Sequence, residues 1–188
     1  MRLILASNSP RRKELLRRDG FNFTVIKSGA KEIVDKDPAK TATINAELKA
    51  EDVFNSLTYK DDACVLSADT IVYFDGEILG KPKDEEDAFN MLKKLSGKTH
   101  FVITGFCIKT KNQKFSAAVQ SAVVFEELTD KFIKDYIATG SPLDKAGAYG
   151  IQDANGMVKT FYGSYDNIIG LPTETIEPLL IKIIRGNS

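Results

Sequence analysis

The stretch LILASNSPRR, residues 3–12, joins a short apolar run, a polar turn and the start of a helix. The apolar run is typical of a buried strand, Ser9 of a helix N-cap and Pro10 of the first helical position. Arg11 and Arg12 follow in the first helical turn, where unpaired backbone N–H groups and the helix macrodipole disfavour cations. We therefore expect a strand, a turn and a helix here, with an anion that offsets the two guanidinium groups.

A phosphate group would satisfy that expectation. Serine hydroxyls, free N–H groups at a helix start and two arginines form a cradle of donors that suits phosphate oxygens. Two solvated arginines on an ordinary amphipathic helix would give the same SPRR motif at residues 9–12. The choice between these two interpretations depends on the rest of the chain.

Composition narrows the class of protein. The chain has 188 residues, 43% of them hydrophobic, and its 26 basic side chains balance 26 acidic ones. This length and apolar content suit one large globular domain or two closely joined lobes. Balanced charge favours a small ligand over nucleic acid or a membrane surface. The N-terminal apolar run is too short for a signal sequence or a membrane span, so we expect a cytoplasmic protein.

Cysteine and histidine contribute little to the expected chemistry. Cys64 and Cys107 lie in apolar stretches outside any C-x-x-C pattern, which predicts buried free thiols and no zinc site. His100 is the only histidine, and it alternates with Val102 and Thr104 on an expected strand, which favours a structural role. Acid–base chemistry is therefore expected from carboxylates, lysines or tyrosines.

Apolar spacing and turn signals predict an alternating order of strands and helices. Strands are expected at residues 3–6, 21–26, 63–66, 71–74, 77–79, 99–109 and 115–125. Helices are expected from Pro10 to Arg18, over residues 43–57, after the caps Asp84 and Thr129, and over residues 173–184, where Pro178 should delay the start or kink the helix. Residues 144–152 should form a functional loop that enters a strand. We expect a single α/β domain over residues 1–188, with a mixed, twisted sheet flanked by helices and two lobes around a central cleft.

Polar residues at element ends are the candidates for chemistry. Asp69 should follow a short strand at its carboxyl end, where α/β sheets bind ligands, although a capping role is equally compatible with this position. Lys49, Lys81, Glu32 and Gln152 each also have a plain interpretation as solvated or loop residues. Together, several cations, a carboxylate and free N–H groups suit phosphoryl chemistry. The glycine-rich motifs of P-loop and Rossmann proteins are not present.

Five motifs carry a family resemblance. They are LASNSPRRKELL, SADTIV, GKPKDEEDAFNMLKKLSGKTH followed by VITG, DKAGAYGIQ, and GSYDNIIGLP. With these motifs in this order, the chain resembles the Maf nucleoside triphosphate pyrophosphatases over nearly its full length. The resemblance implies a fold like that of the inosine triphosphate pyrophosphatases. It also implies hydrolysis of a nucleoside triphosphate to the monophosphate and pyrophosphate, assisted by Mg²⁺ or Mn²⁺.

The same resemblance implies roles for individual residues. The phosphate grip would consist of Ser7, Ser9, Arg11 and Arg12, with Lys49 and Lys81 neutralising the triphosphate. Asp69 would be the general base toward water, and Glu32 with Asp69 would bind the metal; whether Asp69 is base or metal ligand stays open. Substrate choice would depend on Arg12, Thr70 and Gln152. The GAYGIQ segment is similar to the branch that acts on dTTP and UTP, and unlike the one that prefers 7-methyl-GTP.

Other functions are compatible with the same residues. A nucleotide-binding regulator of cell division or septum formation would bind the nucleotide without turnover. A nucleotide phosphatase of another kind would release orthophosphate instead of pyrophosphate. As an enzyme, the protein would remove canonical or modified pyrimidine nucleotides from the precursor pool, and the family resemblance suggests a homodimer.

Overall fold

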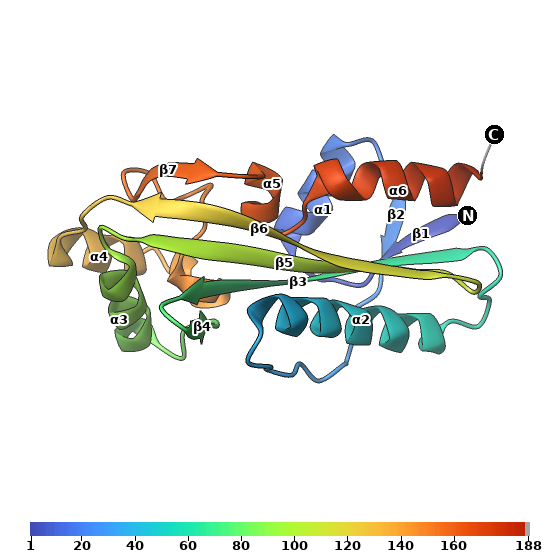
Figure 1. Cartoon of the computed structure of the whole chain (residues 1–188), viewed down its shortest axis with the longest axis horizontal. Coiled ribbons are helices and arrows are strands. Elements are labelled where there is room, and N and C mark those ends of the chain that lie inside the picture. Colours follow the sequence, from blue (N-terminus) through green and yellow to red (C-terminus); the bar gives the residue numbers. More distant parts are fainter. Residues whose placement is uncertain (187–188) are drawn as a thin grey trace. The chain divides into compact units, whose positions relative to one another are not determined.

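Seven strands form one mixed sheet in the order β2-β1-β3-β5-β6-β7, and β4 pairs with β3 (Figure 1). The strands are β1 (Arg2–Leu5), β2 (Phe23–Val25), β3 (Ala63–Phe74), β4 (Glu77–Leu79), β5 (Thr99–Lys109), β6 (Lys114–Phe125) and β7 (Val158–Tyr162). The helices are α1 (Pro10–Arg18), α2 (Pro38–Ser56), α3 (Glu85–Leu95), α4 (Asp130–Ile137), α5 (Tyr165–Ile169) and α6 (Thr173–Arg185). The predicted mixed α/β architecture is confirmed.

The structure, a computed structural model, describes residues 1–186 and divides into two compact units. Unit 1 consists of Met1–Asp69, Thr104–Val119 and Gly170–Ser188. Unit 2 consists of Thr70–Ile103 and Gln120–Ile169. Strands β3, β5 and β6 contribute residues to both units. The predicted pair of lobes corresponds to these units, and their membership of a single domain stays a prediction.

Strand β1 lies between β2 and β3 in unit 1, and its side chains are buried on both faces of the sheet. It pairs in parallel with β2 and with β3, so Ile4 lies beside Thr24 and Val65. Ile4 packs with residues of α2, whereas Leu3 lines a hollow with Ile181 and Ile184 of α6. Figure 1 shows α2 on one side of these strands and α1 and α6 on the other. Helices therefore cover both faces of the sheet in unit 1, as parallel strands require.

Helix α1 begins as the sequence predicts. The Ser9 hydroxyl accepts the N–H of Arg12 at 3.4 Å, and Pro10 occupies the first helical position. Gly20 ends the segment with a φ of 78°, a conformation that glycine adopts without steric cost. The local signals of this stretch therefore suffice to fix the strand, turn and helix.

Helix α2 begins earlier than expected and contacts the sheet through its backbone. Asp37 caps it, and Pro38 starts it, five residues before the predicted start at residue 43. Gly105 of β5 lies directly under the helix, where an added Cβ would come within 2.2 Å of the Ala42 carbonyl carbon. The Ser67 hydroxyl of β3 donates to the Ala46 carbonyl at 2.5 Å. These contacts fix the distance between α2 and the sheet and the position of the helix over β3 and β5.

The prediction that a strand ends at residue 66 is wrong. Strand β3 runs for 12 residues, so Asp69 lies inside the strand and not at its carboxyl end. Ser67, Ala68 and Asp69 resemble a turn in sequence, yet all three are buried. Because Ser67 and Asp69 find hydrogen-bond partners on α2, their polar side chains do not interrupt the strand.

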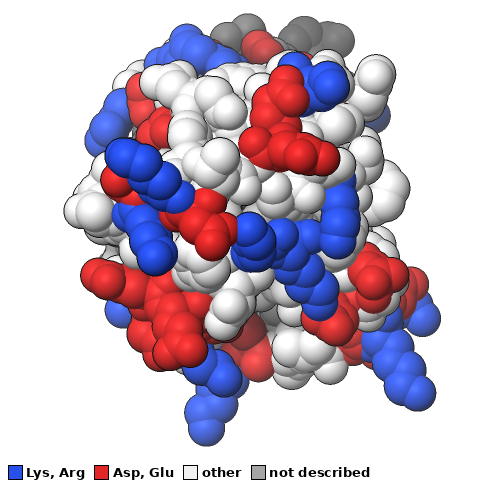
Figure 2. Space-filling view, turned by 90° about the vertical axis from the view of Figure 1, so that its left-hand side faces the viewer, with Lys and Arg blue, Asp and Glu red and all other residues white. Residues whose placement is uncertain are grey.

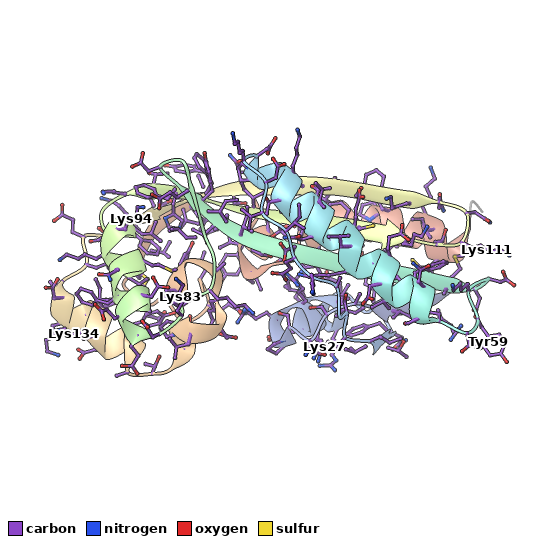
Figure 3. All side chains as sticks on the ribbon, turned by 90° about the horizontal axis from the view of Figure 1, so that it is seen from below. Lys27, Tyr59, Lys83, Lys94, Lys111 and Lys134 are labelled. Atoms are coloured by element: carbon purple, nitrogen blue, oxygen red, sulfur yellow. The ribbon has the colours of Figure 1, made fainter. Side chains whose placement is uncertain are left out.

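The turn end of the β5–β6 hairpin forms ion pairs with α2 and with the segment that joins α2 to β3. Lys114 lies 2.9 Å from Glu47 of α2, and Lys111 in the turn lies 2.6 Å from Asp61. Figure 3 shows Lys111 and Tyr59 together at this end of the unit. The hairpin predicted over residues 99–125 is confirmed.

Unit 2 packs its strands against α3 and α4. The predicted Asp75-Gly76 turn is confirmed: both residues have positive φ, and Val72 pairs with Leu79 across the hairpin. Asp84 and Thr129 cap α3 and α4 as predicted, and Lys93 of α3 forms an ion pair with Asp130 at 2.5 Å. Figure 2 shows acidic and basic side chains interspersed on the face where these helices lie.

Three further elements of the chain differ from the predictions. The segment over residues 144–152 follows the 3-10 turn Ser141–Asp144 and contains the 3-10 turn Ala146–Ala148, and the strand β7 begins only at Val158. The five-residue helix α5 was not predicted. Helix α6 starts at Thr173 and continues through Pro178, because Ile176 and Leu180 on either side are buried and hold both halves against the core. Among the described residues, no helix has the length and apolar character needed to cross a bilayer.

Both cysteines are buried free thiols, as predicted, and burial raises the pKa of each to about 12. His100 is fully buried in unit 2, with its Nε2 2.7 Å from the Tyr149 hydroxyl and its ring edge-on to Phe125. Burial lowers the pKa of His100 to about 4. The imidazole is therefore neutral at physiological pH, which agrees with the predicted structural role.

Acid is expected to destabilise the protein through His100. The imidazole has a pKa of 6.5 in an unperturbed chain and about 4 in the fold, so the unfolded state binds the proton first as the pH falls. The contribution of this neutral imidazole to the free energy of unfolding is fully present above pH 6.5. As the pH falls toward 4, we expect the free energy of unfolding to decrease by about 3 kcal/mol. Urea unfolding at pH 7 and pH 4.5 measures this loss, which His100→Phe should reduce. Equal losses in both proteins would exclude His100 as the cause.

Candidate active site

The carboxylate of Asp69 is held by two side chains of one helix. Lys49 Nζ lies 2.6 Å from its Oδ1, and Asn45 Nδ2 donates to its Oδ2 at 3.0 Å. Asn45 and Lys49 are one helical turn apart in α2 and therefore lie on the same face. Asp69 is only 7% exposed. Each of its oxygens accepts one hydrogen bond in a largely dry environment, so the orientation of the carboxylate is fixed.

Lys49 also contacts a second carboxylate. Its Nζ lies 2.7 Å from Glu32 Oε1, so one ammonium bridges Glu32 and Asp69. The two acids differ in their exposure: 60% of the Glu32 side chain is accessible to solvent, against 11% for Asp69. The arrangement therefore has a buried acid with a fixed orientation and an exposed acid joined to it through a lysine.

Polar side chains along one face of α2 hold the loop that contains Glu32, residues 28–35. We call these side chains the α2 stripe: Thr41, Asn45, Lys49 and Asp52. The Asn45 amide accepts the Ile33 N–H at 2.8 Å and donates to the Ile33 carbonyl at 3.1 Å. Asp52 accepts the Ser28 hydroxyl and the Gly29 N–H, which lower the pKa of its carboxyl group. The loop thus lies along the helix although it has no regular secondary structure.

The predicted phosphate grip forms a connected group in unit 1. Arg12 donates from Nε to the Gly170 carbonyl at 2.8 Å and from Nη1 to the Ser7 hydroxyl at 3.3 Å. The Ser7 hydroxyl also accepts the Ser9 N–H at 3.2 Å. Gly170 begins the GLP sequence that leads into α6, so two of the sequence motifs meet at Arg12.

Several charges act on Arg12. Burial lowers the pKa of its guanidinium, Asp69 raises it, Arg11 lowers it, and Glu32 raises it. Arg12 is half-buried, and the carboxylates of Asp69 and Glu32 both act on its guanidinium. Part of the charge that the helix start disfavours is therefore balanced by acids of the chain itself.

The remaining predicted residues belong to unit 2. Thr70 is half-buried in β3, and Lys81 and Gln152 are exposed. The Gly147 N–H donates to the Gly80 carbonyl at 3.0 Å, which joins the Lys81 loop to the segment that precedes Gln152. Gly147 has a φ of 68°, and an added Cβ would come within 2.9 Å of Val72. The small residues of this segment allow the close backbone approach predicted for it.

The structure therefore brings together part of the predicted set. Within unit 1 it joins Ser7, Ser9 and Arg12 in one group, and Glu32, Lys49 and Asp69 in another, with Arg12 in the field of both acids. Arg11 lies beside Arg12 in α1, whereas Thr70, Lys81 and Gln152 lie in unit 2. Asn45 was missed. Its helical spacing from Lys49 was visible in the sequence, but its partner Ile33 depends on the path of the loop.

The carboxylate oxygens around the Lys49 ammonium would supply only part of the ligands of a divalent cation. Two carboxylate oxygens already face one positive charge, and carboxylates are the ligands that Mg²⁺ prefers. Over residues 1–186, no three side chains of His, Cys, Asp or Glu come together as a metal site. Mg²⁺ is commonly bound by one or two carboxylates plus substrate phosphates, so Glu32 and Asp69 fit this pattern.

Comparisons with known proteins agree with these observations. A family model described as Maf-like protein matches residues 2–183. The chain is 47% identical over 176 residues to a protein of Thermococcus kodakarensis named dTTP/UTP pyrophosphatase, with 93% of each chain covered. It is also 47% identical over 173 residues to a Bacillus pumilus protein of the same name, with 90% of each covered.

A solved structure has the same fold. The Ham1 protein of Staphylococcus aureus aligns over 100% of both chains with a TM-score of 0.52 and 14% sequence identity. At this identity the likeness concerns the fold alone. It supports the predicted architecture of a mixed sheet with flanking helices.

Proposed function

Because the chain belongs to the Maf family, we propose that it hydrolyses dTTP and UTP to the nucleoside monophosphate and pyrophosphate. The observation that carries this conclusion is the similarity to relatives of that name over at least 90% of the chain. The protein is an enzyme, a nucleoside triphosphate pyrophosphatase with a role in clearing unwanted pyrimidine nucleotides.

Asp69 serves as the base in the proposed reaction. Water attacks the α-phosphorus in line, the bond to the bridging oxygen breaks, and pyrophosphate leaves with the bonding electrons. The proton of the water passes to the Asp69 carboxylate. Lys49 and Asn45 each occupy one site on this carboxylate, which has further lone pairs that can accept the proton. The hydrogen bond from Asn45 supports the proposal because it fixes the direction of the acceptor.

The phosphate grip neutralises the developing charge. Donors at the start of α1 come from Ser7, Ser9 and the guanidinium groups of Arg11 and Arg12. The guanidinium group of Arg12 donates to the Gly170 carbonyl, so its orientation is fixed before the substrate binds. Lys81 adds a further cation to the substrate-binding set. The connected hydrogen bonds around Ser7 and Arg12 support this assignment.

Glu32 and Asp69 would hold the divalent cation, Mg²⁺ or Mn²⁺. Such an ion, when bound, polarises phosphate oxygens and offsets their charge. Substrate choice is assigned to Arg12, Thr70 and Gln152. The backbone hydrogen bond from Gly147 to Gly80 supports the proposed role of Gln152 in substrate choice, because it fixes the backbone of the segment that leads to this residue.

Product analysis tests the proposed function. Purified protein with Mg²⁺ should convert dTTP and UTP to the monophosphate and pyrophosphate in equal amounts, and should convert purine nucleotides much more slowly. Separation of products by anion-exchange chromatography measures both. Binding of dTTP without release of either product would instead favour the cell-division regulator, and release of orthophosphate would favour a phosphatase of another kind.

A further inference from the structure

We propose that Lys49 competes with the divalent cation for Glu32 and Asp69, and moves onto the phosphates of the nucleotide when cation and nucleotide bind together. This inference rests on the proposed function, because it takes the two acids as the metal-binding pair. It assigns Lys49 two successive partners in place of a single role as a phosphate ligand.

The contacts of Lys49 are the first support. Its ammonium lies 2.6 Å from Asp69 Oδ1 and 2.7 Å from Glu32 Oε1. The ammonium is therefore a monovalent charge located between the two acids that fit a divalent one. With 16% of its side chain exposed, Lys49 is largely removed from water, which strengthens its attraction to these oxygens.

The two ends of this bridge differ in strength. Glu32 is more than half exposed, so its pair with Lys49 contributes little and separates readily. Asp69 is largely buried, so Lys49 leaves it at a substantial cost unless another cation replaces the lost charge. Replacement by a divalent ion, together with phosphate oxygens for the freed ammonium, satisfies both groups at once.

Asn45 holds both acids in place during this exchange. It donates to Asp69 Oδ2 and is bonded to both backbone groups of Ile33, next to Glu32. It is 3% exposed, so these three bonds are shielded from water. When Lys49 moves, the Asn45 amide still holds the Asp69 carboxylate and the Glu32 loop in place. Asn45 is therefore a positioning residue for both acids.

Direct Mn²⁺ binding without nucleotide tests the proposal. Electron paramagnetic resonance of free Mn²⁺ gives the dissociation constant of the full-length protein. Lys49→Met removes the competing charge, so Mn²⁺ should bind about tenfold more tightly than in the wild type, as expected for one unit charge removed a few ångström from the ion. Lys49→Gln keeps an amide donor for Asp69 and provides the same measurement should the methionine variant not fold. Unchanged or weaker Mn²⁺ binding in a folded neutral variant would overturn the proposal.

Two controls define the origin of the effect. Lys49→Arg keeps the charge and should bind Mn²⁺ as weakly as the wild type. Lys94→Met removes a lysine that pairs with Glu77 in unit 2, so the net charge changes equally without a change at Asp69. Tighter Mn²⁺ binding in this variant would show a general effect of charge and contradict the exchange.

A third comparison locates the ion. Adding Glu32→Gln to Lys49→Met should abolish the gain in affinity, and a gain that persists would place the ion away from this pair.

The product assay on the wild-type protein separates the two proposals. Pyrophosphate release from dTTP with no gain in the neutral variants rejects only the exchange, whereas failure of pyrophosphate release rejects the proposed function itself.

Discussion

Replacing Asp69 by asparagine is expected to lower kcat for dTTP by roughly two to four powers of ten, the usual contribution of a general base. Asparagine has the same size but does not accept a proton from the attacking water. The phosphate grip around Arg12 is unchanged, so nucleotide binding should persist. Initial rates of pyrophosphate release give kcat, and titration of the protein with nucleotide gives the affinity.

A matched control separates the base from the general loss of a carboxylate. Asp62→Asn makes the same chemical change at an exposed acid of unit 1 that pairs with Arg2, and it should leave turnover unchanged. Near wild-type turnover in Asp69→Asn would contradict the assignment. Mn²⁺ binding adds a second distinction. We expect Asp69→Asn to bind Mn²⁺ more weakly, because the proposal places Asp69 among the metal ligands, whereas unchanged binding would leave Asp69 a base alone.

The second large effect is expected from Gly105→Ala, a substitution that changes no charged group of the site. The new Cβ would lie 2.2 Å from the carbonyl carbon of Ala42 and 2.4 Å from the nitrogen of Thr43. Because both contacts involve backbone, helix α2 must shift away from β5. We expect a loss of about 3 kcal/mol in the free energy of unfolding, or roughly 6–12 °C in Tm for a chain of this size.

The same shift should reach the active site. Asn45 and Lys49 follow Ala42 in α2, so their bonds to Asp69 lengthen when the helix moves. A displacement near 1 Å in such groups costs about a hundredfold in rate. Thermal unfolding and kcat/KM below the melting range measure the two effects. Gly29→Ala is the control, because its nearest neighbour would lie 4.0 Å away and its φ is not positive. A Gly105→Ala protein as stable and active as this control would exclude the backbone contact as the cause.

Local signals predicted the elements that depend on neighbouring residues. Ser9 with Pro10 started α1, and Asp75 with Gly76 made the hairpin turn, because capping and positive φ are properties of a few adjacent residues. The start of α2 at Pro38 had the same kind of signal in Asp37. The apolar residues that predict the helix begin only at Ile44, so their spacing does not reach this cap.

Long-range contacts account for what the sequence did not predict. The run Ser67 to Asp69 is polar in a manner typical of a turn, and only its partners on α2 make it part of a strand. The family resemblance implies roles for Asp69, Lys49 and Glu32. These three side chains contact one another in unit 1, and their roles stay predictions. Asn45 lies outside the five motifs. Its role depends on the path of the loop past α2, which brings Ile33 to its side chain.

The attachment of residues 28–35 to the α2 stripe has a consequence for local unfolding. Amide hydrogens of Gly29, Ile33 and Asp35 donate to side chains of α2, although the segment is neither helix nor strand. We therefore expect these amides to be protected from hydrogen exchange while the helix face is intact, and the loop to open together with it as one cooperative unit. The exposed acid at position 32 thus takes its rigidity from the side chains of a neighbouring helix.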